Sequence, residues 1–336
     1  MKTAVLSDGG WGTALALLLV DNGHDVTLWG PFPEYIDQMR QTRENTQFLA
    51  GVELPEALHL SSSIQDSVEG ADLLVLAAPS QYMRSLLQRL APCGPARHGI
   101  PVVNVAKGLE QDTDFRMSEL VEALLGDVRY ATLSGPSHAE EVARHMPTAV
   151  TVASRHADLA EQVQKFFMNE RFRVYTQDDV TGVELGGALK NVFAIAAGVS
   201  DGMGFGDNSR AALMTRGIVE MGRLGEALGG HADTFSGLSG VGDLIVTCTS
   251  QHSRNRYVGQ ELGKGRSLED IQDGMGRQVA EGVRTVRAAF SLARKYDVPT
   301  PIIDEVHAAL YADKDPRRAV TDLMNRDPKA EGPSRR

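Results

Sequence analysis

The amino-terminal half of the chain alternates short apolar runs with stretches whose apolar positions recur at helical spacing. Residues 3–6 and 25–29 have the character of buried strands, and residues 11–21 between them indicate a helix that ends at Asn22-Gly23. Further strands are expected at 73–77, 102–106, 131–133, 149–153 and 173–175, and intervening helices at 81–90, 115–125 and 159–167. This alternation predicts an α/β fold, a mainly parallel sheet covered by helices on both faces.

The pattern changes after about residue 176, where the strand signal stops. The remaining apolar periodicity predicts helices at 180–199, 210–228, 255–262, 282–296 and 302–310. We therefore expect a Rossmann-type α/β domain over residues 1–178 and an all-helical domain over residues 179–325. The polar tail over residues 326–336 contains prolines and glycine and is expected to be disordered.

Composition narrows the classes of partner and compartment. A formal net charge of -10 argues against nucleic acid, which requires a basic face. No apolar run approaches the roughly 20 residues of a membrane helix, so membrane insertion is not expected. The only cysteines are Cys93 and Cys248, which excludes a disulfide framework and favours a reducing compartment, with the cytoplasm as the expectation.

A glycine-containing turn, Ser7-Asp8-Gly9-Gly10-Trp11-Gly12, joins the first strand to the first helix, where a dinucleotide-binding fingerprint belongs. Gly9 would let a pyrophosphate approach the backbone, and the helix terminus offers free N–H groups and a positive dipole end. Gly12 would let the helix lie close to the strand. The second strand is followed by Gly30-Pro31-Phe32, without the acid or arginine that separates NAD from NADP, so that preference stays open.

Two segments at strand ends could carry chemistry. Lys107 follows a buried strand, at the edge where open α/β sheets bind ligands, although a solvent-exposed loop lysine is the simpler interpretation. Residues 134–139 form a second turn of small residues, in which Gly135 and Ser137 offer N–H and hydroxyl donors. Ser137 could equally be a helix N-cap.

Three further segments lie in the helical half. Lys190 follows Gly186-Gly187 in an apolar helix; two helical glycines indicate tight packing, and the lysine is either catalytic or extends from the helix to solvent. Asp243 lies in the first turn after a glycine-rich loop, where it is either a site acid or a complement to the helix dipole. Residues 253–255 (Ser-Arg-Asn) begin a helix and form a potential phosphate site, in which Ser253 could be only an N-cap.

Taken together, these segments resemble the bacterial-type NAD(P)-dependent glycerol-3-phosphate dehydrogenases. The matching stretches occur in family order over about residues 1–325: WGTALA, AKGLE, SGPSHAEEVA, GGALKNVFAIAAGVSDGMGFGDNSRAAL, GVGDLIVTC, SRNR and VAEGVRT. The resemblance implies reversible reduction of dihydroxyacetone phosphate by NADH or NADPH to sn-glycerol 3-phosphate for glycerophospholipid synthesis. It also implies a homodimer and requires no metal.

The resemblance also assigns residue roles by position. The cofactor would contact Gly9, Gly10, Trp11, Gly12, Lys107, Ala139, Arg254, Val279 and Glu281. The substrate would contact Lys107, Gly135, Ser137, Lys190, Asp243, Ser253, Arg254 and Asn255. Lys190 would be the general acid/base, Asp243 would orient it, and Lys107 would supply a second positive charge near the developing alkoxide.

This sequence departs from the family pattern in its cofactor half. Ser7 stands where the family has glycine, Gly9-Gly10 replaces the usual Gly-Ser, and Gly30-Pro31-Phe32 lacks the usual basic or histidine residues. Two alternatives are kept: a β-hydroxyacid or ketopantoate-type reductase, because it would share the two-domain architecture, and a non-catalytic dinucleotide-binding sensor, because Ser7 alters the turn.

Overall fold

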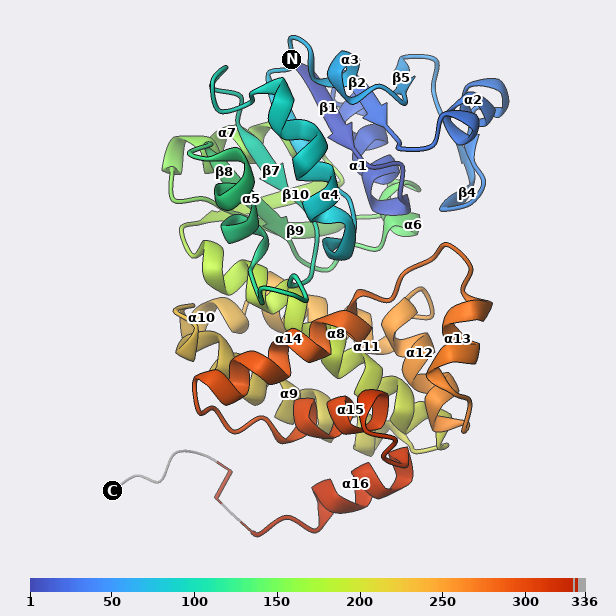
Figure 1. Cartoon of the computed structure of the whole chain (residues 1–336), viewed down its shortest axis with the longest axis vertical. Coiled ribbons are helices and arrows are strands. Elements are labelled where there is room, and N and C mark those ends of the chain that lie inside the picture. Colours follow the sequence, from blue (N-terminus) through green and yellow to red (C-terminus); the bar gives the residue numbers. More distant parts are fainter. Residues whose placement is uncertain (329, 332–336) are drawn as a thin grey trace.

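The computed structural model describes residues 1–328 and 330–331, so most of the predicted disordered tail, residues 329 and 332–336, lies outside the described residues. Figure 1 shows a sheet-containing body above a helical body, with α8 (Val180–Gly202) leading from one into the other. The last strand of the sheet, β10 (Phe172–Gln177), ends just before α8. The predicted boundary at residue 178 falls between these two elements.

The sheet body contains the predicted strands and several short elements that periodicity did not indicate. The strands are β1 (Lys2–Leu6), β2 (Asp25–Trp29), β3 (Glu44–Asn45), β4 (Leu49–Glu53), β5 (Leu58–Ser61), β6 (Leu73–Leu76), β7 (Val102–Asn104), β8 (Tyr130–Ser134), β9 (Thr148–Ala153) and β10. The helices are α1 (Gly10–Asp21), α2 (Pro33–Thr42), α3 (Ile64–Val68), α4 (Ser80–Leu90), η1 (Ala91–Cys93), α5 (Met117–Leu125), α6 (Ala139–Val142) and α7 (Ala157–Phe167).

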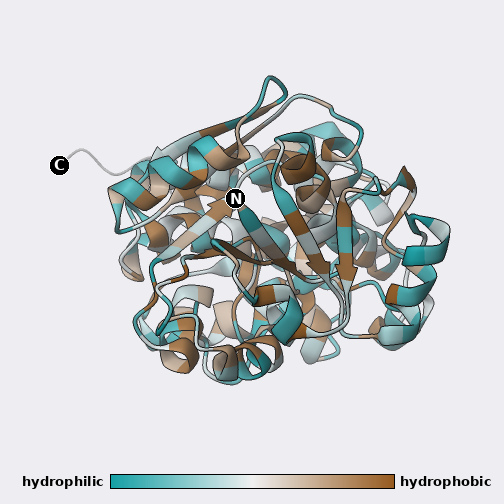
Figure 2. Ribbon diagram, turned by 90° about the horizontal axis from the view of Figure 1, so that it is seen from above, coloured by the Kyte–Doolittle hydropathy of each residue, from teal (hydrophilic) through white to brown (hydrophobic). Residues whose placement is uncertain are grey.

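The main sheet has the order β10-β9-β8-β7-β6-β1-β2-β5, and every neighbouring pair is parallel except β8 with β9. The predicted mainly parallel sheet is confirmed. Successive residues of β1 pack on opposite faces: Val5 joins the core under α1 and α7, whereas Ala4 and Leu6 join the core under α4 and α5. Figure 2 shows hydrophobic segments, in brown, along strands of the sheet, with helices around them.

The helical body is built around α8. The other helices are α9 (Asp207–Ala227), α10 (Ala232–Phe235), the π-helical turn η2 (Leu238–Gly242), α11 (Asp243–Thr249), α12 (Arg254–Gly263), α13 (Leu268–Gly274), α14 (Glu281–Lys295), α15 (Pro301–Tyr311) and α16 (Pro316–Met324). By length and composition α8 could cross a membrane, but 94% of its most apolar window is buried in this fold. It is the core helix of the second body.

Glycines bring α8 and α12 into backbone contact. A Cβ on Gly259 would overlap the carbonyl oxygen of Ile195, and a Cβ on Gly198 would overlap that of Arg256. The tight packing predicted at Gly186 is also present, because a Cβ there would lie 2.6 Å from the Ser239 carbonyl oxygen. This close approach fixes the position of the α12 N-terminus relative to α8.

We expect Gly259→Ala to lower the free energy of unfolding by about 1–3 kcal/mol, because the added methyl must displace backbone atoms. Gly222→Ala in α9 is the matched control: nothing lies within 4 Å of the added Cβ, so the change should stabilise by about 0.5–1 kcal/mol. Urea denaturation followed by far-UV circular dichroism measures both. Equal stabilities of the two variants would contradict this account of the interface.

Candidate active site

Three elements bring the predicted catalytic side chains together where the two bodies meet. Lys107 follows β7 at the carboxyl edge of the sheet, Lys190 lies on α8, and Asp243 begins α11. The Nζ of Lys190 donates to Asp243 Oδ1 at 2.7 Å, and the Nζ of Lys107 donates to Asp243 Oδ2 at 2.8 Å. One carboxylate therefore binds two ammonium groups, one from each body.

The remaining contacts complete both ammonium shells. Lys190 also donates to Thr247 Oγ1 at 2.7 Å, a residue one helical turn beyond Asp243 that sequence reasoning missed. Lys107 also donates to the Gly135 carbonyl oxygen at 2.7 Å and to Ser137 Oγ at 3.1 Å. Lys190 is thus buried and hydrogen-bonded, which excludes the interpretation that it extends to solvent.

Burial and charge set the protonation of this cluster. Burial alone would raise the pKa of the Asp243 carboxyl, but Lys107 and Lys190 outweigh that effect and hold the pKa below its usual range. Burial lowers the pKa of Lys107 to about 8, the Asp243 carboxylate opposes the shift, and the Lys190 ammonium adds to it. The cluster suits an anionic ligand or a carbonyl that gains negative charge.

His138 is a second residue that sequence reasoning passed over. Burial, followed by the Lys190 ammonium, lowers the pKa of its ring, so the neutral form is favoured. Its Nε2 is buried and has no hydrogen-bond partner in the part of the chain that the structure describes. His138, not Ser137, occupies the N-cap position of α6, although its side chain makes no capping hydrogen bond, so the alternative interpretation of Ser137 as that helix's N-cap is wrong. The hydroxyl of Ser137 instead donates to the Gly135 carbonyl oxygen at 2.9 Å.

The predicted phosphate segment starts α12. Ser253 is the N-cap of this helix, its Oγ accepting from the Arg256 amide at 3.2 Å. Arg254 lies on the first turn with an exposed side chain. Asn255 is used within the fold: its Nδ2 donates to Asn191 Oδ1 at 2.9 Å, and its Oδ1 accepts from the Gly282 amide at 2.8 Å.

Asn191 extends this network to the lysine cluster, because its Nδ2 donates to the carbonyl oxygen of Lys107 at 2.9 Å. The network therefore joins the β7 loop, α8, the first turn of α12 and the start of α14. Beside it, Glu281 accepts from the Ser80 amide at 2.8 Å, which ties α14 to the N-terminus of α4. Val279 lies two residues before α14 and is half-buried.

The turn after β1 has the features of a pyrophosphate cradle. Gly9 occupies the N-cap position of α1 and has no side chain that could accept a hydrogen bond. No side-chain cap therefore covers the N–H groups of the first turn. A Cβ on Gly10 would lie 2.6 Å from the Phe48 carbonyl oxygen, and one on Gly12 would overlap the Ser7 carbonyl oxygen. Ala139 lies against Gly10, and Trp11 Nε1 is buried without a partner among the described residues. These residues fit a bound dinucleotide.

Ser7 lies at φ +154°, in the range where glycine is favoured. A non-glycine residue held in a sparsely populated region of this kind costs on the order of 1–3 kcal/mol. Its Oγ accepts from the Gly9 amide at 3.2 Å, a contact that glycine would not make. The replacement of the fingerprint glycine by serine therefore strains the backbone but retains the shape of the turn.

Comparison with known proteins gives matches over both bodies. Family models described as the N-terminus and the C-terminus of NAD-dependent glycerol-3-phosphate dehydrogenase match residues 2–160 and 179–321. A glycerol-3-phosphate dehydrogenase [NAD(P)+] of Geobacter metallireducens is 52% identical over 333 residues, covering 98% of each chain. The crystal structure of a glycerol-3-phosphate dehydrogenase from Coxiella burnetii aligns with TM-score 0.92 at 39% identity, covering 96% of this chain and 98% of that one.

A more distant likeness bears on the hydroxyacid alternative. A D-mandelate dehydrogenase aligns with TM-score 0.63 at 14% identity, covering 95% of this chain and 100% of that one. At this identity the likeness shows a shared fold alone, and it gives the hydroxyacid alternative no support beyond the common architecture.

Proposed function

This chain belongs to the NAD-dependent glycerol-3-phosphate dehydrogenase family, and from that premise we propose how its residues perform the reaction. It is an oxidoreductase that uses NAD(H) or NADP(H), and its substrates are dihydroxyacetone phosphate and sn-glycerol 3-phosphate. The observation that carries the residue assignment is the buried Asp243 carboxylate between Lys107 and Lys190. A proton donor and a second positive charge are thereby held where the two bodies meet.

Reduction of the ketone to an alcohol adds a hydride to the carbonyl carbon and a proton to the carbonyl oxygen. Bound reduced nicotinamide supplies the hydrogen and two electrons to that carbon. Lys190, as an ammonium, polarises the carbonyl and donates the proton, and it accepts the proton back in the reverse direction. Asp243 and Thr247 fix the direction of the Lys190 ammonium, while Lys107 stabilises negative charge on the substrate oxygen.

Binding is divided between two helix N-termini. Gly9, Gly10, Trp11 and Gly12 at the start of α1 hold the pyrophosphate, with Ala139, Val279 and Glu281 beside the cofactor. The first turn of α12 holds the substrate phosphate, with Arg254 as the charged contact. Because Asn255 is committed to Asn191 and Gly282, its part in phosphate binding is to hold that first turn in place. Binding of the substrate phosphate at this turn orients the substrate carbonyl toward Lys190.

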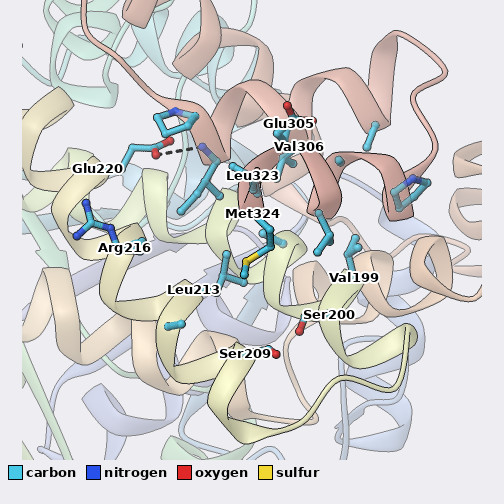
Figure 3. Close-up of a pocket in the computed structure, with 18 of the residues that line it drawn as sticks. Val199, Ser200, Ser209, Leu213, Arg216, Glu220, Glu305, Val306, Leu323 and Met324 are labelled. Atoms are coloured by element: carbon cyan, nitrogen blue, oxygen red, sulfur yellow. Dashed lines mark hydrogen bonds between the residues drawn. The ribbon is translucent and has the colours of Figure 1, made fainter. Parts of the chain in front are cut away.

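The assembly and location we propose are a cytoplasmic homodimer that supplies glycerophospholipid synthesis. Both cysteines are unpaired, which suits a reducing compartment. An apolar hollow of about 740 Å³ lies between α8, α9, α15 and α16. Figure 3 shows Leu213 of α9 and Leu323 and Met324 of α16 around it. A second copy of the chain would cover this surface.

Replacing Lys190 by alanine should lower kcat by roughly 10²–10⁴-fold, the range typical of a lost general acid. Binding of the cofactor, measured by calorimetry, should change little, because the dinucleotide turn lies on the other body. Lys295→Ala, which removes an exposed lysine at the end of α14, is the control and should be as active as the parent protein. Substantial turnover by Lys190→Ala would refute the acid/base assignment.

Replacing Arg254 by alanine should raise KM for dihydroxyacetone phosphate by about 10–100-fold, the value of a charged hydrogen bond worth 1.5–3 kcal/mol. Arg155→Ala is the control, since it removes an arginine that follows β9 and is also exposed. Initial rates at varied substrate concentration separate KM from kcat. An unchanged KM would remove Arg254 from the phosphate site and leave the Lys190 assignment untouched.

Sedimentation of the chain should give twice the 36.3 kDa monomer mass. Val219→Glu places a charge in the apolar hollow and should shift the protein toward the monomer. Tyr175→Glu adds the same charge at a similarly exposed position on β10 and should leave the dimer intact. A monomeric parent protein, or a Val219→Glu variant that stays dimeric, would contradict this interface.

A further inference from the structure

Asp8 is a buried carboxylate in the dinucleotide turn that the reaction above does not use. The residue is 6% exposed, and its Oδ2 has no hydrogen-bond partner anywhere in residues 1–328 and 330–331. Its backbone, in contrast, is well held: the Asp8 carbonyl oxygen accepts from Asn45 Nδ2 at 2.7 Å and from Thr13 Oγ1 at 3.4 Å. The turn therefore fixes the place of a carboxylate that has one oxygen unsatisfied.

The place that this carboxylate occupies is the end of the neighbouring strand. β1 and β2 are parallel with Leu6 opposite Trp29, so the chain after β1 runs beside Gly30. A Cβ on Gly30 would lie only 2.6 Å from Asp8 Oδ2. Asp8 thus occupies, beside the end of the Ile36 side chain at 2.7 Å from the same Cβ, the space that a side chain at the end of β2 would enter. The absence of a side chain at Gly30 makes room for the carboxylate.

In NAD-binding folds of this type, an acid near the end of the second strand accepts a hydrogen bond from the ribose 2′-hydroxyl. We propose that Asp8, reaching over from the first turn into the space beside Gly30, performs this task and makes the enzyme selective for NAD(H) over NADP(H). The assignment rests on the proposed cofactor site and deepens it by naming the residue that distinguishes the two cofactors.

The charge of the carboxylate supports this direction of selectivity. Burial raises the pKa of Asp8 to about 6, its own backbone amide and the Arg277 guanidinium opposing that rise, so at neutral pH the group is mainly an anion that can only accept. A ribose hydroxyl satisfies such an acceptor. A 2′-phosphate would bring like charge against it in a poorly solvated place, where repulsion is weakly screened.

Arg277 is the group that would favour NADP(H), because its positive charge could pair with the 2′-phosphate. It lies in the loop between α13 and α14, which reaches up to the sheet body in Figure 1. Its guanidinium lies 5.1 Å from the centre of the Phe32 ring, and its Nη1 donates to Gln47 Oε1 at 3.2 Å. Because Arg277 is exposed, solvent screens its charge, whereas Asp8 is buried and dominates the discrimination.

Calorimetric titration of the whole protein with NADH and with NADPH tests the role of Asp8 without relying on turnover. The parent protein should bind NADH at least about tenfold more tightly, the value of one hydrogen bond to a charged group. Asp8→Asn keeps the shape of the side chain and removes its charge, so it should weaken NADH binding, strengthen NADPH binding and reduce the ratio to about threefold or less. Asp25→Asn, at the opposite end of β2, is the charge-matched control and should keep the parent ratio.

A double variant keeps the test decisive even if a single change at Asp8 impairs folding. Asp8→Ala combined with Gly30→Asp returns a carboxylate to the same space from β2, so it should restore the NADH preference that Asp8→Ala alone loses. A parent protein that prefers NADPH, with Arg277→Ala abolishing that preference, would overturn the proposal in favour of the arginine. A ratio unchanged in both Asp8→Asn and Asp8→Ala would also overturn it. Binding of neither cofactor to the folded parent protein would instead refute the cofactor site itself.

Discussion

Asp243 is only 1% exposed, and an ion buried to that degree is costly unless its charge is balanced and its lone pairs are used. Both conditions are met here by lysines that come from different bodies of the protein, Lys107 after β7 and Lys190 on α8. Loss of one partner of a buried pair commonly destabilises by about 3–5 kcal/mol. The ion cluster to which we assign the proton transfer therefore also helps to hold the two bodies together.

Placing Lys107 and Lys190 on one carboxylate requires α8 to approach the sheet edge closely. Gly187 makes this possible, because a Cβ there would lie 2.6 Å from Ser134 Oγ and 3.5 Å from Lys107 Cγ. Farther along α8, Gly198 lets α12 come into backbone contact, and α12 supplies the proposed phosphate-binding turn. Glycines in one helix thus set the distance between the proposed proton donor and the proposed phosphate-binding turn, although glycine lowers helix propensity.

The sequence predicted the long periodic elements well and the short ones poorly. β2 and the start of α8 fall where periodicity placed them, but α2, α3, α6 and the β3–β4 pair were missed, because two to ten residues give too few turns or alternations to show a period. The lysines and Asp243 were identified through motifs. Thr247 lies four residues after Asp243 on the same helix, a spacing that could have revealed it. The hydrogen-bond partners of Asn255 could not be predicted from the sequence, because Asn191 and Gly282 lie 64 and 27 residues away along the chain and only the fold brings them together.

The cofactor turn departs from the family pattern in some of its side chains but keeps glycine where neighbouring backbone atoms leave no room for a Cβ. Gly10 and Gly12, where a Cβ would collide with carbonyl oxygens, are retained, whereas Ser7 replaces glycine at φ +154°. The Ser7 hydroxyl accepts from the Gly9 amide and so offsets part of the backbone strain. Asp8 follows directly and projects to Gly30, itself a departure. Because the carboxylate needs the space that Gly30 leaves free, Asp8 and Gly30 depend on each other, and neither can be understood from its own position alone.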